Sequence, residues 1–142
     1  MPLPLKQTKQ HAMQQLYDKL RGASEIPITE RSDIASKGLY MTLHGKQEIL
    51  IKQSQSVREK LKVLLHEYSH YIHLTHYFNQ ESRAECELIA NGAAFVVSRR
   101  YGLSISKGVN LAKFTDDAGV IERLTAIIQT VAGHILAGLN KD

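Results

Sequence analysis

His66-Glu67-Tyr68-Ser69-His70 carries the pattern H-E-x-x-H. On a helix, residues four positions apart share one face, so both imidazoles can reach the same metal ion. Glu67 lies beside that face, where its carboxylate can take a proton from a water molecule at the metal. The five residues therefore predict a zinc site with a catalytic base, if they lie on a helix and a third ligand follows them.

The residues that lead into the motif carry the signals of an amphipathic helix. Ser56 can cap the first turn, and Glu59 follows three residues later, as in a capping box. Apolar side chains then recur at helical spacing through the motif: Val57, Leu61, Leu64, Leu65, Tyr68 and Ile72. The pattern predicts that the motif lies in the C-terminal half of a helix whose apolar face packs on a core.

The whole chain predicts an α+β fold, with about four helices packed on a small antiparallel hairpin or sheet. Apolar stripes indicate three further helices, over residues 6–21, 81–101 and 120–139. Small residues at positions 90–94 would let another backbone approach the second of these closely. Residues 104–117 look like a polar connection.

A β-hairpin is expected before the motif helix. Residues 39–43 and 48–52 read as its two strands around a turn at Gly45-Lys46. Residues 26–36 look irregular or contain a short strand. An edge strand of the hairpin could hold an extended peptide by backbone hydrogen bonds, although the same apolar residues also suit plain core formation.

Composition is that of one soluble domain over residues 1–142, with 43% hydrophobic and 23% charged residues. Residues 1–6 contain no apolar segment of the kind a signal peptide needs. The apolar C-terminal stretch is interrupted by Gly, His and polar residues, so we expect it to be too short and too mixed to span a bilayer. The single cysteine, Cys86, excludes an internal disulfide and suits a reducing compartment. We therefore expect a cytoplasmic protein with no membrane partner.

The formal net charge is +4, and the basic residues are scattered apart from small clusters such as Arg99-Arg100. A solvated basic surface is the simpler interpretation of this pattern. A nucleic-acid partner is therefore not expected, and would require an affinity that falls steeply with salt.

The third metal ligand has to come from an element after the motif. Glu85 and Glu87 point about 200° apart on a helix, so at most one faces the metal easily. Glu87 shares its face with Asn91 and Ala94, on the small-residue side suited to packing on the motif helix. Glu81 lies near the helix start, where an acid complements the dipole without a metal. We expect Glu87 as the third ligand, with Glu85 and Glu81 as alternatives.

Other polar residues near the motif are expected to play lesser roles. His73 follows His70 on nearly the same helix face, so it would have difficulty reaching the same ion and is expected beside the ligands or in solvent. A turn is expected around residues 76–80, with His76 exposed in it, and Cys86 is expected to be a small buried side chain. A second electrophile could hold the oxyanion of a cleaved carbonyl, and the candidates are Tyr101, Tyr71, His44 and Arg123.

Two stretches resemble the ImmA/IrrE family of zinc metallopeptidases. They are Leu64-Leu65-His66-Glu67-Tyr68-Ser69-His70-Tyr71 and Glu87-Leu88-Ile89-Ala90-Asn91-Gly92-Ala93-Ala94-Phe95, the second being similar to the E-x-x-A-N helix of that family. The resemblance covers about residues 39–103. It implies a minimal zincin-like domain that holds one Zn²⁺ per chain through His66, His70 and Glu87, with Glu67 as the catalytic base.

The resemblance also implies a function. Members of the family are cytoplasmic, zinc-dependent endopeptidases associated with phages or mobile elements, and they cleave a regulatory protein, typically a transcriptional repressor. The alternative is a non-catalytic zincin scaffold that binds a regulatory or antirestriction partner. The intact Glu67 argues against this alternative, because a purely structural zinc site needs no general base.

Overall fold

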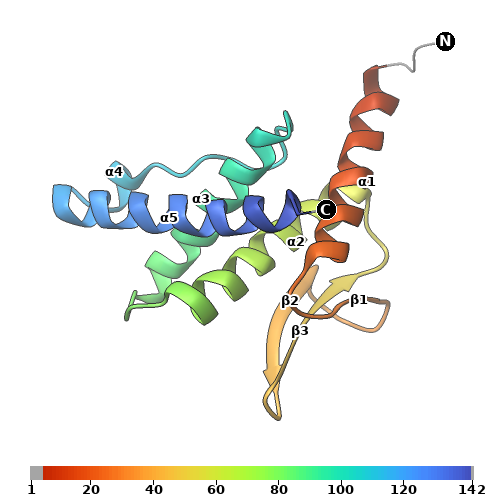
Figure 1. Ribbon diagram of the computed structural model, residues 1–142, viewed down its shortest axis with the longest axis horizontal. Coiled ribbons are helices and arrows are strands. Elements are labelled where there is room, and N and C mark those ends of the chain that lie inside the picture. Colours follow the sequence, from red (N-terminus) through yellow and green to blue (C-terminus); the bar gives the residue numbers. More distant parts are fainter. Residues whose placement is uncertain (1–4, 142) are drawn as a thin grey trace.

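The computed structural model describes residues 5–141 and combines α-helices with a three-stranded sheet (Figure 1). The prediction about a signal peptide concerns mostly residues outside this range. The elements in chain order are α1 (Leu5–Ala23), β1 (Ile28–Arg31), β2 (Gly38–Leu43), β3 (Lys46–Lys52), α2 (Val57–Ile72), the π-helix η1 (His73–Tyr77), α3 (Arg83–Arg100), α4 (Leu111–Phe114) and α5 (Ala118–Leu139). The predicted α+β class is confirmed. The described residues add α4, whose four residues are too few to show a periodic pattern.

The sheet has the strand order β1-β3-β2. Strands β2 and β3 form the predicted antiparallel hairpin, but the turn lies one residue earlier than expected, at His44 and Gly45, which have φ values of 51° and 78°. Strand β1 pairs in parallel with β3, with Ile28 opposite Ile49. The sheet is therefore mixed, and β2 is left as an edge strand.

Helix α2 lies at the centre of the fold, in contact with α1, α3, α5 and the strands β2 and β3. Ser56 caps it by accepting a hydrogen bond from the backbone nitrogen of Glu59 at 3.2 Å. The predicted apolar face is buried in the shared core, at Leu61, Leu64, Leu65, Tyr68 and Ile72. Its packing holds the opposite, polar side of α2 in a defined orientation, which is where His66 and His70 lie.

Helix α5 is long enough and apolar enough to cross a membrane by length and composition alone, so the expectation that this stretch is too short is wrong. In the structure it packs across α3 and ends beside α1 (Figure 1). It buries one face, formed by Leu124, Ile128, Val131, Ala132, Ile135 and Leu139. Glu122, Gln129 and Thr130 are exposed, so α5 has the pattern of an amphipathic helix on a core.

The chain leaves α2 through η1 and not through the turn predicted at residues 76–80. Helical backbone continues to Tyr77, and only Gln80, with φ of 63°, adopts the left-handed conformation before α3 begins. π-Helical turns are rare and are often found at functional sites. The extra helical residues hold His76 against groups from distant parts of the chain, as described below.

Gly38 lies where β2 approaches α2 closely. A Cβ atom there would lie 2.3 Å from Val63 Cγ1 and 2.9 Å from the backbone oxygen of Leu50. Gly38→Ala is therefore expected to destabilise the fold by about 1–3 kcal/mol, because β2 must shift away from α2. Thermal or denaturant unfolding measures this loss. Gly22→Ala is the control, because its Cβ would meet nothing within 4 Å; an equal loss there would contradict the steric explanation.

Candidate metal centre

Helices α2 and α3 face each other with their metal-ligating side chains together. His66 and His70 project from α2 one turn apart, and Glu87 and Asn91 project from α3 towards them. The small residues between positions 90 and 94 do allow a close approach: Ala90, Ala93 and Ala94 are buried. Gly92 serves a different neighbour, since a Cβ there would lie 2.6 Å from Ile128 of α5.

Three potential ligand side chains converge between the two helices. His66 Nε2 lies 3.1 Å from His70 Nε2, and the Glu87 carboxylate lies 2.9 Å from His70 Nε2 and 3.2 Å from His66 Nε2. A tetrahedral ion with bonds of about 2.0–2.1 Å places its ligand atoms about 3.3 Å apart. Two imidazoles and one carboxylate also form a ligand set that zinc takes at catalytic sites. The residues therefore fit a zinc ion.

Asn91 orients one of the imidazoles. Its Oδ1 lies 2.8 Å from His66 Nδ1, so the ring nitrogen donates and the amide oxygen accepts. This hydrogen bond keeps the proton on Nδ1 and leaves the lone pair of Nε2 directed at the other ligands, which is the tautomer that a metal requires. The sequence places Asn91 on the small-residue face and in the E-x-x-A-N stretch without giving it a role, and this hydrogen bond supplies one.

Burial favours the neutral, metal-binding form of His70. Burial and the charge of His66 lower the pKa of His70, while Glu87 acts in the opposite direction. A neutral imidazole offers its lone pair without first losing a proton.

Glu67 is half-buried and is anchored to the sheet. One of its carboxylate oxygens accepts a hydrogen bond from the backbone nitrogen of Tyr40, on β2, at 3.3 Å. Burial raises the pKa of Glu67 above its ordinary value, against the lowering effects of His66 and of the Tyr40 hydrogen bond. A carboxylate with a raised pKa is a stronger base, as proton transfer near neutral pH requires. Glu67 also offers an oxygen within 4.8 Å of the nearest ligand nitrogens of His66 and His70.

The two alternative acids have other partners. Glu85 accepts a hydrogen bond from Ser82 in the capping box of α3 and forms an ion pair with Arg123 at 2.6 Å; the backbone hydrogen bond to Ser82 and the Arg123 charge lower its pKa. Glu81 is buried and pairs with His73. Of the three acids, the structure thus brings Glu87 to the two imidazoles.

The structure places His73, His76 and Cys86 in surroundings that agree only partly with the predictions made for them. His73 is expected beside the ligands or in solvent, and the solvent alternative is wrong, because His73 is fully buried against Glu81. His76 is partly exposed as expected, but it lies on η1 with Glu25 as a hydrogen-bond partner. Cys86 is half-buried, and burial raises the pKa of its thiol.

The four candidate electrophiles interact elsewhere. Tyr71 donates a hydrogen bond to Glu25 at 3.0 Å, and Arg123 is paired with Glu85. Tyr101 carries the Lys19 ammonium 5.9 Å from its ring centre. His44 is exposed in the hairpin turn. The structure therefore gives none of these four a partner at His66 or His70.

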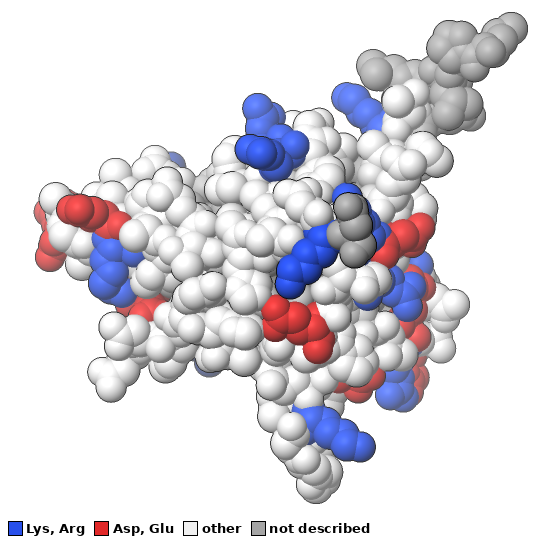
Figure 2. Space-filling view, viewed as in Figure 1, with Lys and Arg blue, Asp and Glu red and all other residues white. Residues whose placement is uncertain are grey.

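A groove of about 600 Å³ opens beside the candidate centre. His66, Glu67 and Asn91 line one part of it. Three lysines are among its other lining residues: Lys37 just before β2, Lys62 on α2 and Lys107 in the connection after α3. One acid, Glu59, lies among them and pairs with Lys37 at 3.3 Å. Elsewhere, Figure 2 shows basic and acidic side chains interspersed over the face that it draws.

The fold and the site together define a small α+β domain with His and Glu groups that could hold a metal ion. Comparison of the chain with models of protein families, with curated proteins and with solved structures found no match. The resemblance to the ImmA/IrrE family thus rests on the two sequence stretches that carry it.

Asn91→Ala is expected to weaken zinc binding by about 10- to 100-fold, because His66 loses the group that holds its tautomer and ring orientation. Competition with a chromogenic zinc chelator measures the change. Asn79→Ala is a control on an exposed residue and should leave zinc affinity as it is. An unchanged affinity in Asn91→Ala would contradict the role given to this hydrogen bond.

Proposed function

We propose that this protein is a cytoplasmic, zinc-dependent endopeptidase that cleaves a regulatory protein, in the manner of the ImmA/IrrE family that it resembles. One observation carries the proposal. Ligand atoms of His66, His70 and Glu87 lie 2.9–3.2 Å from one another, with one Glu87 oxygen directed at each imidazole, and Glu67 lines the groove beside them. A structural site has no use for the adjacent carboxylate or for the open groove.

Each residue has a distinct task in this proposal. His66, His70 and Glu87 would hold the zinc ion, and Asn91 keeps His66 in the binding tautomer. Zinc, when bound, supplies Lewis acidity that makes a water molecule easier to deprotonate and a carbonyl more electrophilic. The Glu67 carboxylate takes the proton from the attacking water and passes it to the amine that leaves.

The edge strand β2 supports binding of an extended substrate. The backbone nitrogen of Lys52 donates to the oxygen of Lys37, whereas that of Tyr40 donates to Glu67. Backbone N–H and C=O groups alternate in direction along a strand. The backbone groups of Gly38, Tyr40 and Thr42 therefore point away from β3, towards the open edge of β2. A peptide in an extended conformation can add to such an edge, which brings its carbonyls towards Glu67.

The charge of the groove favours acidic residues beside the cleaved bond. Lys62 and Lys107 are exposed on its wall, and Glu59, which also lines the groove, is already paired with Lys37. Acidic side chains of a substrate would therefore meet uncompensated positive charge. Complementary charge of this kind raises the rate of association and selects among partners.

Incubation of the zinc-loaded protein with a mixture of defined peptides, with products mapped by mass spectrometry, tests the proposal. We expect endoproteolytic cleavage that is lost on chelation, restored by zinc, and enriched at bonds flanked by Asp or Glu. Lys62→Glu together with Lys107→Glu should lower kcat/KM for these peptides by about tenfold, since each reversed charge repels the substrate. Peptide binding without any cleavage would favour the non-catalytic scaffold instead.

A further inference from the structure

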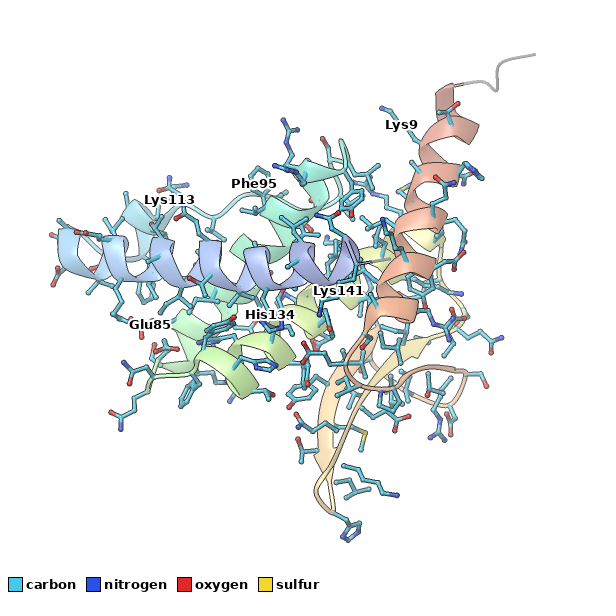
Figure 3. All side chains as sticks on the ribbon, in the orientation of Figure 1. Lys9, Glu85, Phe95, Lys113, His134 and Lys141 are labelled. Atoms are coloured by element: carbon cyan, nitrogen blue, oxygen red, sulfur yellow. The ribbon has the colours of Figure 1, made fainter. Side chains whose placement is uncertain are left out.

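A second group of metal-ligating side chains lies apart from the candidate centre. It joins Glu25, in the loop after α1, with His76 of η1 and His134, which projects from α5 (Figure 3). His76 Nε2 lies 2.8 Å from Glu25 Oε1, and His134 Nε2 lies 2.7 Å from Glu25 Oε2. The two imidazole rings are 4.5 Å apart between their centres, and the Glu25 carboxylate contacts both of them, one with each oxygen.

We propose that Glu25, His76 and His134 form a second binding site for a divalent metal ion of the zinc type. Two imidazole nitrogens and one carboxylate oxygen are ligands that zinc accepts, and all three atoms lie within 4.8 Å of one another. The three side chains are 23–37% exposed. They are therefore reachable by an ion from solvent, and a water molecule can complete the coordination.

Surrounding tyrosines hold Glu25 and His134 in position. Tyr71 donates its hydroxyl to Glu25 Oε1 at 3.0 Å, and the backbone nitrogen of Glu25 donates to the hydroxyl of Tyr68 at 3.1 Å. The Tyr77 hydroxyl lies 2.8 Å from His134 Nδ1. A hydroxyl can accept as well as donate, so Tyr77 can take the Nδ1 proton of a metal-bound imidazole. Such outer partners are characteristic of metal-binding histidines.

The charge of the group suits a cation. Although burial acts to raise it, hydrogen bonds from His134, His76 and Tyr71 hold the pKa of Glu25 down at about 2. Glu25 is thus ionised at neutral pH and can neutralise part of the charge of a bound ion. Binding of the ion would displace the protons through which the imidazoles now contact Glu25.

The second site lies apart from the first, and an ion bound there would stabilise the fold. Tyr71 turns towards Glu25, whereas its neighbour His70 turns towards Glu87. Glu25 and His134 are 109 positions apart in the chain, so an ion there would tie the end of α5 to the loop after α1 and to η1. An ion that binds only the folded chain stabilises it, and the second site would act as such a tie without taking part in catalysis.

Metal counting on the full chain tests the proposal. Metal-free protein, prepared by dialysis against a chelator, is titrated with zinc by calorimetry, and bound zinc is measured by elemental analysis. We expect two zinc ions per wild-type chain, one in His66→Ala with His70→Ala, one in His134→Ala, and none when all three changes are combined. His44→Ala, in the exposed hairpin turn, is the control and should retain two.

Thermal unfolding gives a second readout that does not depend on activity. In the chain that carries His66→Ala and His70→Ala, zinc at 100 times its Kd should raise Tm by about 5–10 °C. Adding Glu25→Gln should abolish that rise, with circular dichroism used to show that the helices persist. One zinc ion in the wild type that is unaffected by His134→Ala, or a rise in Tm that survives Glu25→Gln, overturns the proposal.

Discussion

Glu67→Gln is expected to reduce kcat for peptide cleavage by about 100- to 10,000-fold, the range that a positioned general base contributes. Glutamine keeps the size of the side chain and can still accept a hydrogen bond from the backbone nitrogen of Tyr40. It cannot accept a proton from water at neutral pH. The chemical step should therefore fail, while the three ligand side chains and the fold remain.

Two measurements distinguish a loss of cleavage caused by the missing base from one caused by loss of zinc or of the fold. Zinc affinity and Tm of Glu67→Gln should match those of the wild type, because His66, His70 and Glu87 retain their contacts. Glu122→Gln, at an exposed position on α5, is the matched control and should cleave at the normal rate. Retained cleavage in Glu67→Gln would rule out the role of Glu67 as the base.

Glu87→Gln is expected to lower zinc affinity by more than about 100-fold, which exceeds the effect of changing a residue that only orients a ligand. The neutral amide removes the one negative charge among the three ligands, and it binds zinc far less well than a carboxylate. Cleavage should fall in proportion to the zinc lost and recover partly at high zinc concentration. Calorimetric titration of the metal-free protein, followed by activity against zinc concentration, measures both effects.

Glu85→Gln provides the comparison, since Glu85 lies two positions away on the same helix. It removes the ion pair with Arg123 and should cost at most about 1 kcal/mol of stability, because the pair is partly exposed. Zinc affinity should stay unchanged. A loss of zinc in Glu85→Gln and not in Glu87→Gln would reverse the assignment of the third ligand.

Much of the fold could be predicted because its signals are local. Ser56 and Glu59 mark the start of α2, and the apolar spacing that follows gives its buried face. The hairpin was also predicted, with its turn displaced by one residue to His44 and Gly45. Residues 26–36 read only as irregular or as a short strand, since the four residues of β1 gain their hydrogen bonds by pairing with β3. A short sequence window contains little information about pairing between separated segments.

The continuation of α2 into η1 was missed for a similar reason. The sequence predicts a turn around residues 76–80, whereas helical backbone continues from His73 to Tyr77. The buried pair of His73 and Glu81 and the contact of His76 with Glu25 both form only in the folded chain. These tertiary contacts accompany the π-helical geometry that local propensity alone does not predict.

The sequence by itself determined the helix that bears His66, His70 and Glu67, because residues four apart share a helix face wherever that helix packs. Only the tertiary structure decided which acid meets them. Glu81, Glu85 and Glu87 are the same residue type and lie close together in the chain. Their distances from the imidazoles depend on how α3 crosses α2. The same holds for Asn91 and for the group of Glu25, His76 and His134. Contacts between elements depend on the packing of a whole core, which no local pattern encodes.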